Sequence, residues 1–459
     1  MGWRTRSLFR AWCVVVATGL SLPGAAPQAG APVDGRIKTL TQAYNASGQQ
    51  LFGQFAASSG NVVFSPYSIG AAMAMALAGA RGVTQTEMLS ALQQKLSPSE
   101  INAANAAALA VLGGYDTSAM APECPPGTTF SDGRCEAPVL SNGRCPPPLE
   151  PGDDKCVGPP AERPSAVLAL ANALMQTEGA PPVADDYKAL LERDYAAETF
   201  DAVQLDDVNA WVSRKTQGKI DRILSRVPPN ATILLNAVYF KAHWRSQFLV
   251  SATQDEAFHL DGSQSVQTPT MHKTEHLALA RQPGFRAVAL PYDVGGIEMV
   301  VVLPDATDGA AAIARRLDAP QLDALFAALQ TAEGQSVDLA LPKFKARFAA
   351  DNVEKAFQRL GMVRAFDCYR ADFSGVTDQP VGQERMFISQ IAHRAILDVM
   401  ESGTEAAAAT AVALSGHAAS RPGLPPTPFH VDHPFLFYVL EETTGAILFQ
   451  GRIVDPRQS

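Results

Sequence analysis

The sequence has little that points to nucleic-acid binding or catalysis. No run of Lys and Arg is longer than two residues, and 46 acidic residues against 37 basic ones give a formal net charge of −9. A nucleic-acid-binding surface normally shows a basic face or stripe, so no nucleic-acid partner is expected. Neither a G-x-S-x-G nucleophile elbow nor a G-x-x-x-x-G-K-[ST] phosphate loop occurs. We therefore expect no enzymatic activity and no cofactor.

One motif does match a catalytic signature. His272-Lys-Thr-Glu275-His276 follows the H-x-x-E-H pattern of inverted zinc proteases, whose chemistry needs both histidines on one face of a helix. Pro269 stands just ahead, and the flanking residues give no amphipathic helix. A polar surface segment explains the motif better, and no metal site is expected.

Apolar runs of membrane-spanning length are also missing. The run from Ala11 to Leu22 follows Arg4, Arg6 and Arg10 and precedes a small-residue stretch, the pattern of an export signal. It is shorter than the roughly 20 residues that cross a bilayer. We interpret residues 1–29 as a signal peptide and 30–459 as one domain. The mature protein is then expected to be secreted, or periplasmic in a bacterium, and not in a membrane.

Cysteine is scarce outside one stretch. Cys13 would leave with the signal and Cys368 would be a lone thiol. The other four lie in a Pro/Gly-rich segment, residues 114–165, and are expected to form disulfides: Cys124, Cys135, Cys145 and Cys156. Two similar 12-residue repeats favour pairing of the first with the second and the third with the fourth, although four cysteines allow three pairings. The gaps are too long for a zinc site. We expect a cross-linked inserted loop.

The rest of the chain mixes helices and strands without regular βαβ alternation, which indicates an α+β fold. Helices are expected through much of residues 37–112, notably 68–80 and 101–112, and over 207–224. Buried strands are expected at the following ranges: 167–175, 231–240, 336–350, 435–440 and 446–454.

The segment 401–420, ESGTEAAAATAVALSGHAAS, is the most informative one. Its alanines favour a helix, and a flexible linker is the other plain interpretation. As a strand, it would present one uncharged face to a core: Thr404, Ala406, Ala408, Thr410, Val412 and Leu414. The opposite face carries a single charge, Glu405, and no proline interrupts the segment before Pro422. The segment can therefore join the interior of a sheet.

At this point the sequence resembles the serpin family over roughly residues 40–113 and 166–456. Beside GTEAAAATAV from Gly403, the similar segments are NVVFSPYSIGAAMAMALAGARGVTQTEM, LANALM, WVSRKTQGKI, LLNAVYFKAHW and HPFLFYVLEETTGAILFQGRI. The resemblance implies three β-sheets, including a large central one, with about eight to nine helices. It also implies an exposed reactive-centre loop, residues 401–428.

The resemblance further implies roles for individual residues. Trp244 is similar to the aromatic residue at the top of the central sheet, where the loop first inserts. A hydrogen-bonded cluster beneath that sheet would comprise Ser65, Ser68, Asn236 and His393. The hinge of the loop would comprise Glu401, Gly403, Thr404, Glu405, Ala406, Ala407, Ala408 and Ala409.

The activity implied is irreversible inhibition of serine proteases. The protease would attack the loop as a substrate and be trapped as an acyl-enzyme when the cut loop inserts into the central sheet. Family spacing from Glu401 puts the reactive bond at His417–Ala418, which favours a chymotrypsin-like or subtilisin-like protease. Leu414 and Arg421 are the alternatives, the latter for a trypsin-like protease.

Other properties follow from the same resemblance. Residues 101–112 contain no basic side chain, so activation by heparin is not expected, and a monomer is. The competing interpretation is a non-inhibitory relative, such as a carrier, chaperone or storage protein. Relatives of that kind often carry charged, bulky or proline residues in the hinge, which this sequence lacks.

Overall fold

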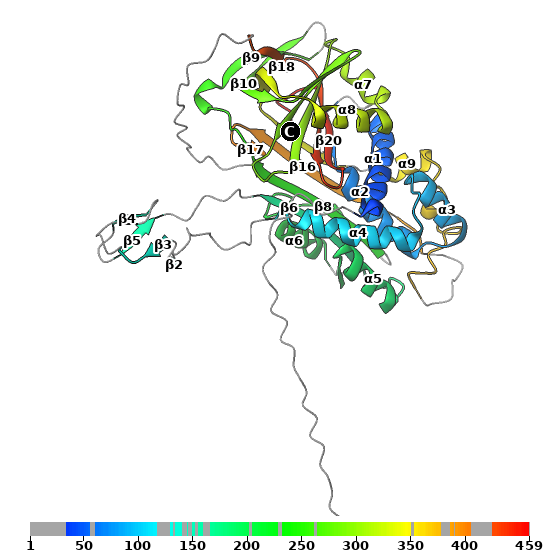
Figure 1. Cartoon of the computed structure of the whole chain (residues 1–459). Coiled ribbons are helices and arrows are strands. Elements are labelled where there is room, and N and C mark those ends of the chain that lie inside the picture. The colour runs from blue at the N-terminus through cyan, green and yellow to red at the C-terminus, as the bar shows by residue number, and fades with distance from the viewer. Residues whose placement is uncertain are drawn as a thin grey trace, which may run out of the picture.

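The structure is a computed structural model (Figure 1). It describes residues 34–55, 60–116, 129–131, 134–139, 145, 149–151, 155–158, 166–201, 204–227, 232–260, 264–349, 353–377, 386–389, 391–404 and 425–458. The proposed signal peptide lies outside these ranges, and so do residues 405–424, which make up most of the expected loop.

Three larger sheets form the body of the described chain. The central sheet has the order β15 (Phe344–Ala349), β16 (Ala392–Met400), β17 (Gly403–Thr404), β8 (Thr232–His243), β6 (Val167–Gln176) and β7 (Glu198–Asp201). A second sheet has the order β1 (Val62–Phe64), β20 (Ala446–Ile453), β19 (Phe435–Glu441), β13 (Ile297–Pro304), β12 (Phe285–Pro291) and β11 (Leu279–Gln282). A third has the order β18 (Thr427–His430), β14 (Gln335–Pro342), β10 (Ser265–Leu277) and β9 (Gln254–His259).

Nine α-helices lie in the described part of the chain: α1 (Gly35–Phe55), α2 (Pro66–Gly79), α3 (Gly82–Ala91), α4 (Pro98–Gly113), α5 (Asp185–Tyr195), α6 (Leu205–Lys215), α7 (Ala310–Arg316), α8 (Ala319–Thr331) and α9 (Val353–Arg359). Short 3₁₀ helices occupy Val250–Ala252 and Arg364–Phe366. The α+β architecture with a large central sheet, expected from the sequence, is confirmed.

The central sheet is covered on both faces, and β8 shows how the sequence achieves this. Alternate residues of a strand point to opposite faces. Val238, Phe240 and Ala242 belong to the main hydrophobic core, which also contains α2. Leu235 and Ala237, on the other face, belong to a separate cluster with Trp211 of α6 and its neighbours. Any strand that pairs with β8 would therefore also point alternate residues into these two apolar clusters.

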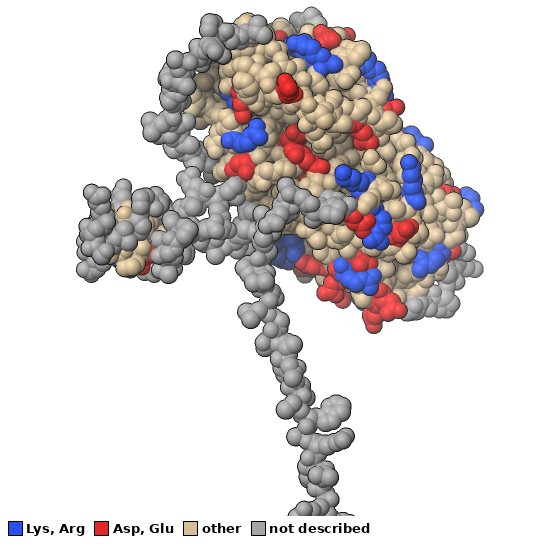
Figure 2. Space-filling view, viewed as in Figure 1, with Lys and Arg blue, Asp and Glu red and all other residues tan. Residues whose placement is uncertain are grey.

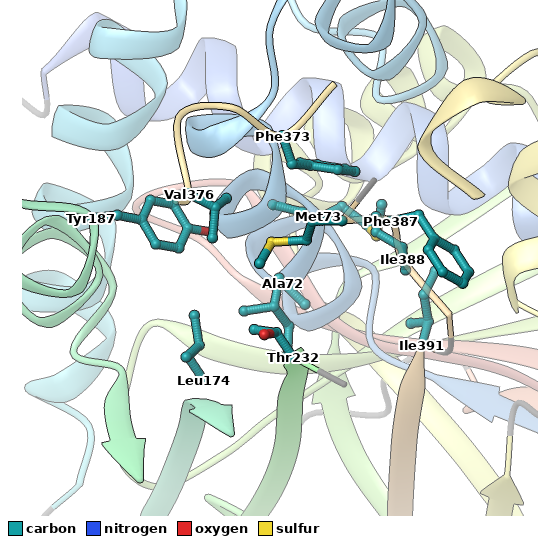
Figure 3. Close-up of a pocket in the computed structure, with 13 residues that line it drawn as sticks. Ala72, Met73, Leu174, Tyr187, Thr232, Phe373, Val376, Phe387, Ile388 and Ile391 are labelled. Carbon is teal, nitrogen blue, oxygen red and sulfur yellow. The ribbon is translucent and has the colours of Figure 1, made fainter. Parts of the chain in front are cut away.

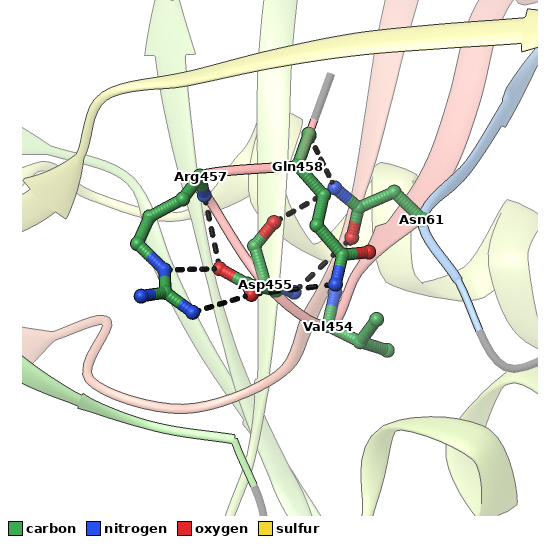
Figure 4. Close-up of polar contacts among 5 residues, drawn as sticks. All are labelled: Asn61, Val454, Asp455, Arg457 and Gln458. Carbon is green, nitrogen blue, oxygen red and sulfur yellow. Dashed lines mark hydrogen bonds and ion pairs between the residues drawn. The ribbon is translucent and has the colours of Figure 1, made fainter. Parts of the chain in front are cut away.

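The C-terminal segment is fastened to the start of β1 by one amide (Figure 4). Asn61 Nδ2 donates to the carbonyl oxygens of Asp455 and Gln458, each at 2.8 Å. Its Oδ1 accepts from the backbone N–H of Val454 at 2.8 Å. Arg457 in turn donates to the Asp455 carboxylate at 3.0 Å. These bonds tie the segment after β20 to the start of β1, the edge strand that pairs with β20.

The Cys-rich insertion contains a small sheet of its own, where the sequence predicted only a loop. Its strands have the order β2 (Thr129–Ser131), β3 (Arg134–Ala137), β5 (Cys156–Gly158) and β4 (Glu150–Pro151). Cys145 and Cys156 form a disulfide, as the repeat predicted. Cys135 is also disulfide-bonded, whereas Cys124 lies outside the described residues. The small hydrophobic cluster of this sheet is separate from the main core.

Two surface properties agree with the composition. On the face shown in Figure 2, Lys and Arg side chains alternate with Asp and Glu without a broad basic stripe. Among the helices that the structure describes, none combines the length and the apolar character needed to cross a membrane.

Candidate functional site

The two middle strands of the central sheet part at one end. Along their lower half β8 and β16 pair directly and in parallel, from Leu235 opposite Ala392 to Tyr239 opposite Ile396. Above this point β17 lies between them. It is antiparallel to both, because the chain reverses direction after β16. β8 and β16 therefore pair with each other over 235–239 and 392–396, whereas Gly403 and Thr404 separate them at the other end.

Gly403 is the first of these two residues, and only glycine fits there. Its φ of +151° is a conformation that side-chain-bearing residues rarely adopt. A Cβ at this position would lie 2.1 Å from the carbonyl oxygen of Ala242 and 2.6 Å from Cα of His243. The close approach lets β17 pair with β8 and β16 at once.

Thr404, the second residue, is completely buried. Its Oγ1 lies 2.6 Å from the hydroxyl of Tyr292. Tyr292 stacks on Trp244, with ring centroids 4.5 Å apart, and Trp244 Nε1 donates to the carbonyl of Met400 at 3.0 Å. The aromatic pair therefore forms a floor beneath β17. Trp244 was expected here from the sequence, whereas Tyr292 was not.

The turn that precedes β17 is anchored at Glu401. Its carbonyl accepts from the backbone N–H of Phe248 at 2.9 Å, and its carboxylate forms an ion pair with Lys343 at 2.9 Å and accepts from Thr253 Oγ1 at 2.8 Å. Burial alone would raise the pKa of Glu401, but the hydrogen bonds from Lys343, Thr253 and the backbone outweigh it, and the pKa lies below its usual value. The turn between β16 and β17 is therefore fixed by an ion pair and hydrogen bonds at Glu401.

A buried polar cluster lies beneath the closed half of the sheet. Ser65 caps α2 by accepting from the backbone N–H of Ser68 at 3.0 Å, and such a cap contributes about 1 kcal/mol. The hydroxyl of Ser68 donates to Asn236 Oδ1. His393 Nε2 accepts from the backbone N–H of Ser65 at 3.3 Å. Asn236 and His393 are opposite each other in the β8–β16 pairing, so the structure brings all four predicted cluster residues together.

The pKa of His393 in this cluster is strongly perturbed by burial. Burial, with a smaller contribution from Arg394, lowers its pKa to about 3. The ring is therefore neutral at physiological pH, and its Nδ1 is buried with no hydrogen-bond partner. An unsatisfied buried nitrogen costs about 1–3 kcal/mol. Asn172, which was not expected from the sequence, completes the cluster by accepting from Asn236 Nδ2 at 2.8 Å.

An apolar pocket lies at the foot of the same two strands (Figure 3). Thr232 and Leu234 of β8 and Ile391, just before β16, line one side, and Met73 of α2 and Phe387 line another. Figure 3 shows Met73 above Thr232, with Phe387 and Ile391 to one side. The pocket thus continues the line of β17 down the sheet.

Several predicted site residues lie outside the described residues. These are Glu405, Ala406, Ala407, Ala408, Ala409, Leu414, His417, Ala418 and Arg421. The H-x-x-E-H segment is described, and it lies in strand β10. At about 3.3 Å per residue, His272 and His276 are too far apart in a strand for the helical zinc-protease arrangement. Within the described ranges no group of His, Cys, Asp and Glu could hold a metal ion.

Comparison with known proteins identifies the family. The family model described as Serpin (serine protease inhibitor) matches residues 42–122 and 154–456, leaving out the middle of the Cys-rich insertion. An uncharacterised serpin-like protein of Thermococcus kodakarensis is 30% identical over 438 residues, covering 92% of this chain and 87% of that protein.

Two solved structures show the same fold. The thermophilic serpin tengpin in its native state has a TM-score of 0.72 at 22% identity and covers 93% of this chain and 95% of its own. Human thyroxine-binding globulin has a TM-score of 0.72 at 23% identity and covers 92% of this chain and 100% of its own.

Proposed function

This chain belongs to the serpin family, and we propose that it is an irreversible inhibitor of serine proteases that traps its target by inserting the cleaved loop into the central sheet. The observation that carries the proposal is the position of β17. Gly403 and Thr404 already pair with both β8 and β16, so the remainder of the loop has a strand to extend.

The register of β17 fixes the neighbours of each residue in an extended strand. Thr404 is opposite Ala242 and Val399. If the strand were extended in the same register, Ala406 would be opposite Phe240 and Ala408 opposite Val238. All even-numbered residues of the loop would then face the main core, to which Phe240 and Val238 belong. None of them is charged, so insertion buries no ion on that face.

The same register gives the polar cluster a role. Thr410 would lie between Asn236 and His393, which now pair directly. Its hydroxyl would reach the face on which His393 Nδ1 lacks a partner. A hydrogen bond there would remove an unsatisfied buried group, a gain of about 1–3 kcal/mol. This hydrogen bond would therefore offset part of the free energy needed to separate β8 from β16 at the Asn236–His393 pair.

The apolar pocket marks the end of the insertion path. In the same register Val412 would be opposite Leu234 and Leu414 opposite Thr232. Leu234 and Thr232 both line the pocket, and Thr232 is labelled in Figure 3. Val412 and Leu414 are the larger apolar side chains of the core-facing row. Burying a Val or Leu side chain contributes about 1.5–3 kcal/mol. About ten to fifteen new backbone hydrogen bonds add roughly 1 kcal/mol each.

The chemistry belongs to the protease. Its serine hydroxyl attacks the carbonyl carbon of the residue before the reactive bond, and the amine of the following residue leaves with a proton. An ester then joins the protease to the inhibitor. Insertion carries the esterified end toward the foot of the sheet and distorts the protease, so water does not complete hydrolysis. Insertion must outrun hydrolysis, which small hinge residues favour.

We place the reactive bond at His417–Ala418, with Leu414 and Arg421 as alternatives. A chymotrypsin-like or subtilisin-like target follows from His417, and a trypsin-like one from Arg421. We also propose that residues 1–29 direct export, that residues 30–459 form one domain interrupted at 114–165, and that the protein acts as a monomer without heparin.

The fold likeness to thyroxine-binding globulin makes a carrier the second candidate. The small, uncharged hinge supports an inhibitor instead. Incubation with chymotrypsin, subtilisin, elastase and trypsin separates the two. An inhibitor gives a covalent complex that survives boiling in detergent, and mass spectrometry of the released C-terminal peptide locates the reactive bond. A carrier is nicked without forming a complex.

A further inference from the structure

A second cavity is lined by residues at the C-terminal end of α8, the helix labelled beside the second sheet in Figure 1. Its volume is about 450 Å³. Three kinds of group line it: residues at the end of α8, apolar side chains of the second sheet and its neighbours, and four polar or charged side chains. The last are Arg245, His276, Glu298 and Glu442; Gln330, at the end of α8, is a fifth polar residue of the lining.

Glu298 is the unusual member of this lining. It lies in the middle of the second sheet, between Pro291 of β12 and Leu440 of β19. Only 8% of the residue is exposed, and its Oε1 is buried with no hydrogen-bond partner. A buried carboxylate oxygen without a partner is costly. At the wall of this cavity, the carboxylate oxygen Oε1 of Glu298 therefore accepts no hydrogen bond from any group of the described chain.

Two further features make the cavity negative. The last carbonyl groups of an α-helix lack partners within the helix and carry about half a negative charge, and Leu329, Gln330 and Ala332 bring that end of α8 to the cavity. The last turn of α8 contains no basic residue to offset it. Glu442 adds a carboxylate, so Arg245 opposes two carboxyl groups and a helix end.

The electrostatics of the carboxyl groups agree with this arrangement. Burial raises the pKa of Glu298 to about 7, and Glu442 contributes in the same direction while Arg245 opposes it. Burial and the adjacent Glu441 raise the pKa of Glu442 as well. Both raised pKa values mean that ionising these carboxyl groups is costly here, and a bound cation would lower that cost.

We propose that this cavity binds a small organic cation, a primary ammonium group on a short apolar chain, with Glu298 Oε1 and the carbonyl end of α8 as its acceptors. The ammonium group supplies three donors, and the chain packs on Leu277, Leu329 and Pro291, which also line the cavity. A metal ion fits less well, since no cluster of three or more ligating side chains occurs in the described ranges.

The site is distinct from the hinge although it adjoins it. Arg245 and Pro291 line the cavity, and the residues next to them, Trp244 and Tyr292, form the floor under Thr404. Glu298 lies in the second sheet, whereas β17 belongs to the central sheet. Loss of the cation site should therefore leave protease inhibition unchanged, and the two proposals can fail independently.

The test titrates the full-length protein with n-butylammonium chloride by isothermal calorimetry, with n-butanol and calcium chloride in parallel. We expect saturable binding of n-butylammonium with a Kd on the order of 1 mM, a value reasonable for a five-heavy-atom ligand, and no binding of n-butanol. Glu298→Gln, which keeps the shape of the side chain, should weaken binding about tenfold. Affinity should rise as the pH passes through about 7 and Glu298 ionises.

Glu333→Gln is the matched control, because Glu333 is exposed just beyond the same helix end and does not line the cavity. It should bind n-butylammonium like the parent. Glu442→Gln should show a smaller loss than Glu298→Gln and serves if the latter folds poorly. Absence of binding, equal binding of n-butanol, competition by calcium, or equal affinities of the Glu298→Gln and Glu333→Gln proteins would each overturn the proposal.

Discussion

Replacement of Thr404 by arginine tests whether the loop inserts from β17. Thr404 is fully buried, and its hydroxyl contacts Tyr292. An unpaired guanidinium in this place would cost about 3–5 kcal/mol. The backbone bonds of a two-residue strand contribute roughly 1 kcal/mol each, too little to hold the charge inside. In the Thr404→Arg protein we expect β17 to leave the sheet, so that insertion loses its starting point.

Thr404→Val is the matched control. It removes the hydrogen bond to Tyr292, worth about 1 kcal/mol, but keeps the size and apolar packing of the side chain. The assay measures the number of inhibitor molecules consumed per protease inactivated, together with detergent-stable complex on a gel. The parent and Thr404→Val should form complex, whereas Thr404→Arg should be cleaved as a substrate. Equal trapping by the Thr404→Arg protein would show that insertion of the loop does not start from β17.

Three further perturbations test other parts of the account. Gly403→Ala forces a Cβ to within 2.1 Å of a carbonyl oxygen at a strained φ, costing about 1–3 kcal/mol, and should slow complex formation measurably in stopped-flow assays. Glu401→Gln should lower the thermal midpoint at neutral pH. Because the pKa of Glu401 is lowered, its ion pair with Lys343 stabilises the fold above the ordinary value of 4.5 and is lost as the pH falls through the lower folded-state pKa, so the parent and variant midpoints should converge in acid. Cys145→Ser with Cys156→Ser should destabilise the small sheet by about 3 kcal/mol, seen as faster proteolysis of the insertion, with inhibition unchanged.

Much of the fold follows from hydrophobic patterns within single segments. The strand predicted over 167–175 is observed at Val167–Gln176, and the one over 231–240 at Thr232–His243. The apolar, small-residue run after Ser65 is the buried helix α2. These segments are long and strongly patterned, so local sequence is sufficient to identify them.

The segment 336–350 shows where local patterns fail. It reads as one strand, but β14 and β15 belong to different sheets, and the chain crosses between them at Lys343. Nothing in the alternation of residues shows a change of sheet. The same crossing brings Lys343 to Glu401, so the ion pair at the root of the loop could not be predicted from local sequence. Likewise the helix expected over 207–224 ends at Lys215, followed by Gln217 and Gly218 with positive φ.

Parts of the candidate site were reachable only through resemblance to the family. Ser65 and His393 are distant in sequence and meet where the backbone N–H of Ser65 donates to His393 Nε2, which no composition or spacing rule predicts. Tyr292 and Asn172 carried no sequence signal of their own, since buried aromatic and amide side chains are common in cores. Their contacts, Tyr292 with Thr404 and Asn172 with Asn236, are known only from the three-dimensional structure.

The most direct measurement is the thermal stability of the protein before and after cleavage of the loop between 405 and 424 by a protease that it does not trap. Insertion adds a strand to the central sheet, so the account predicts that the cleaved parent unfolds at a much higher temperature than the intact one, and that the cleaved Ala406→Pro protein gains far less because proline removes a ladder hydrogen bond. An unchanged midpoint on cleavage of the parent, or an equal gain in both proteins, would contradict it.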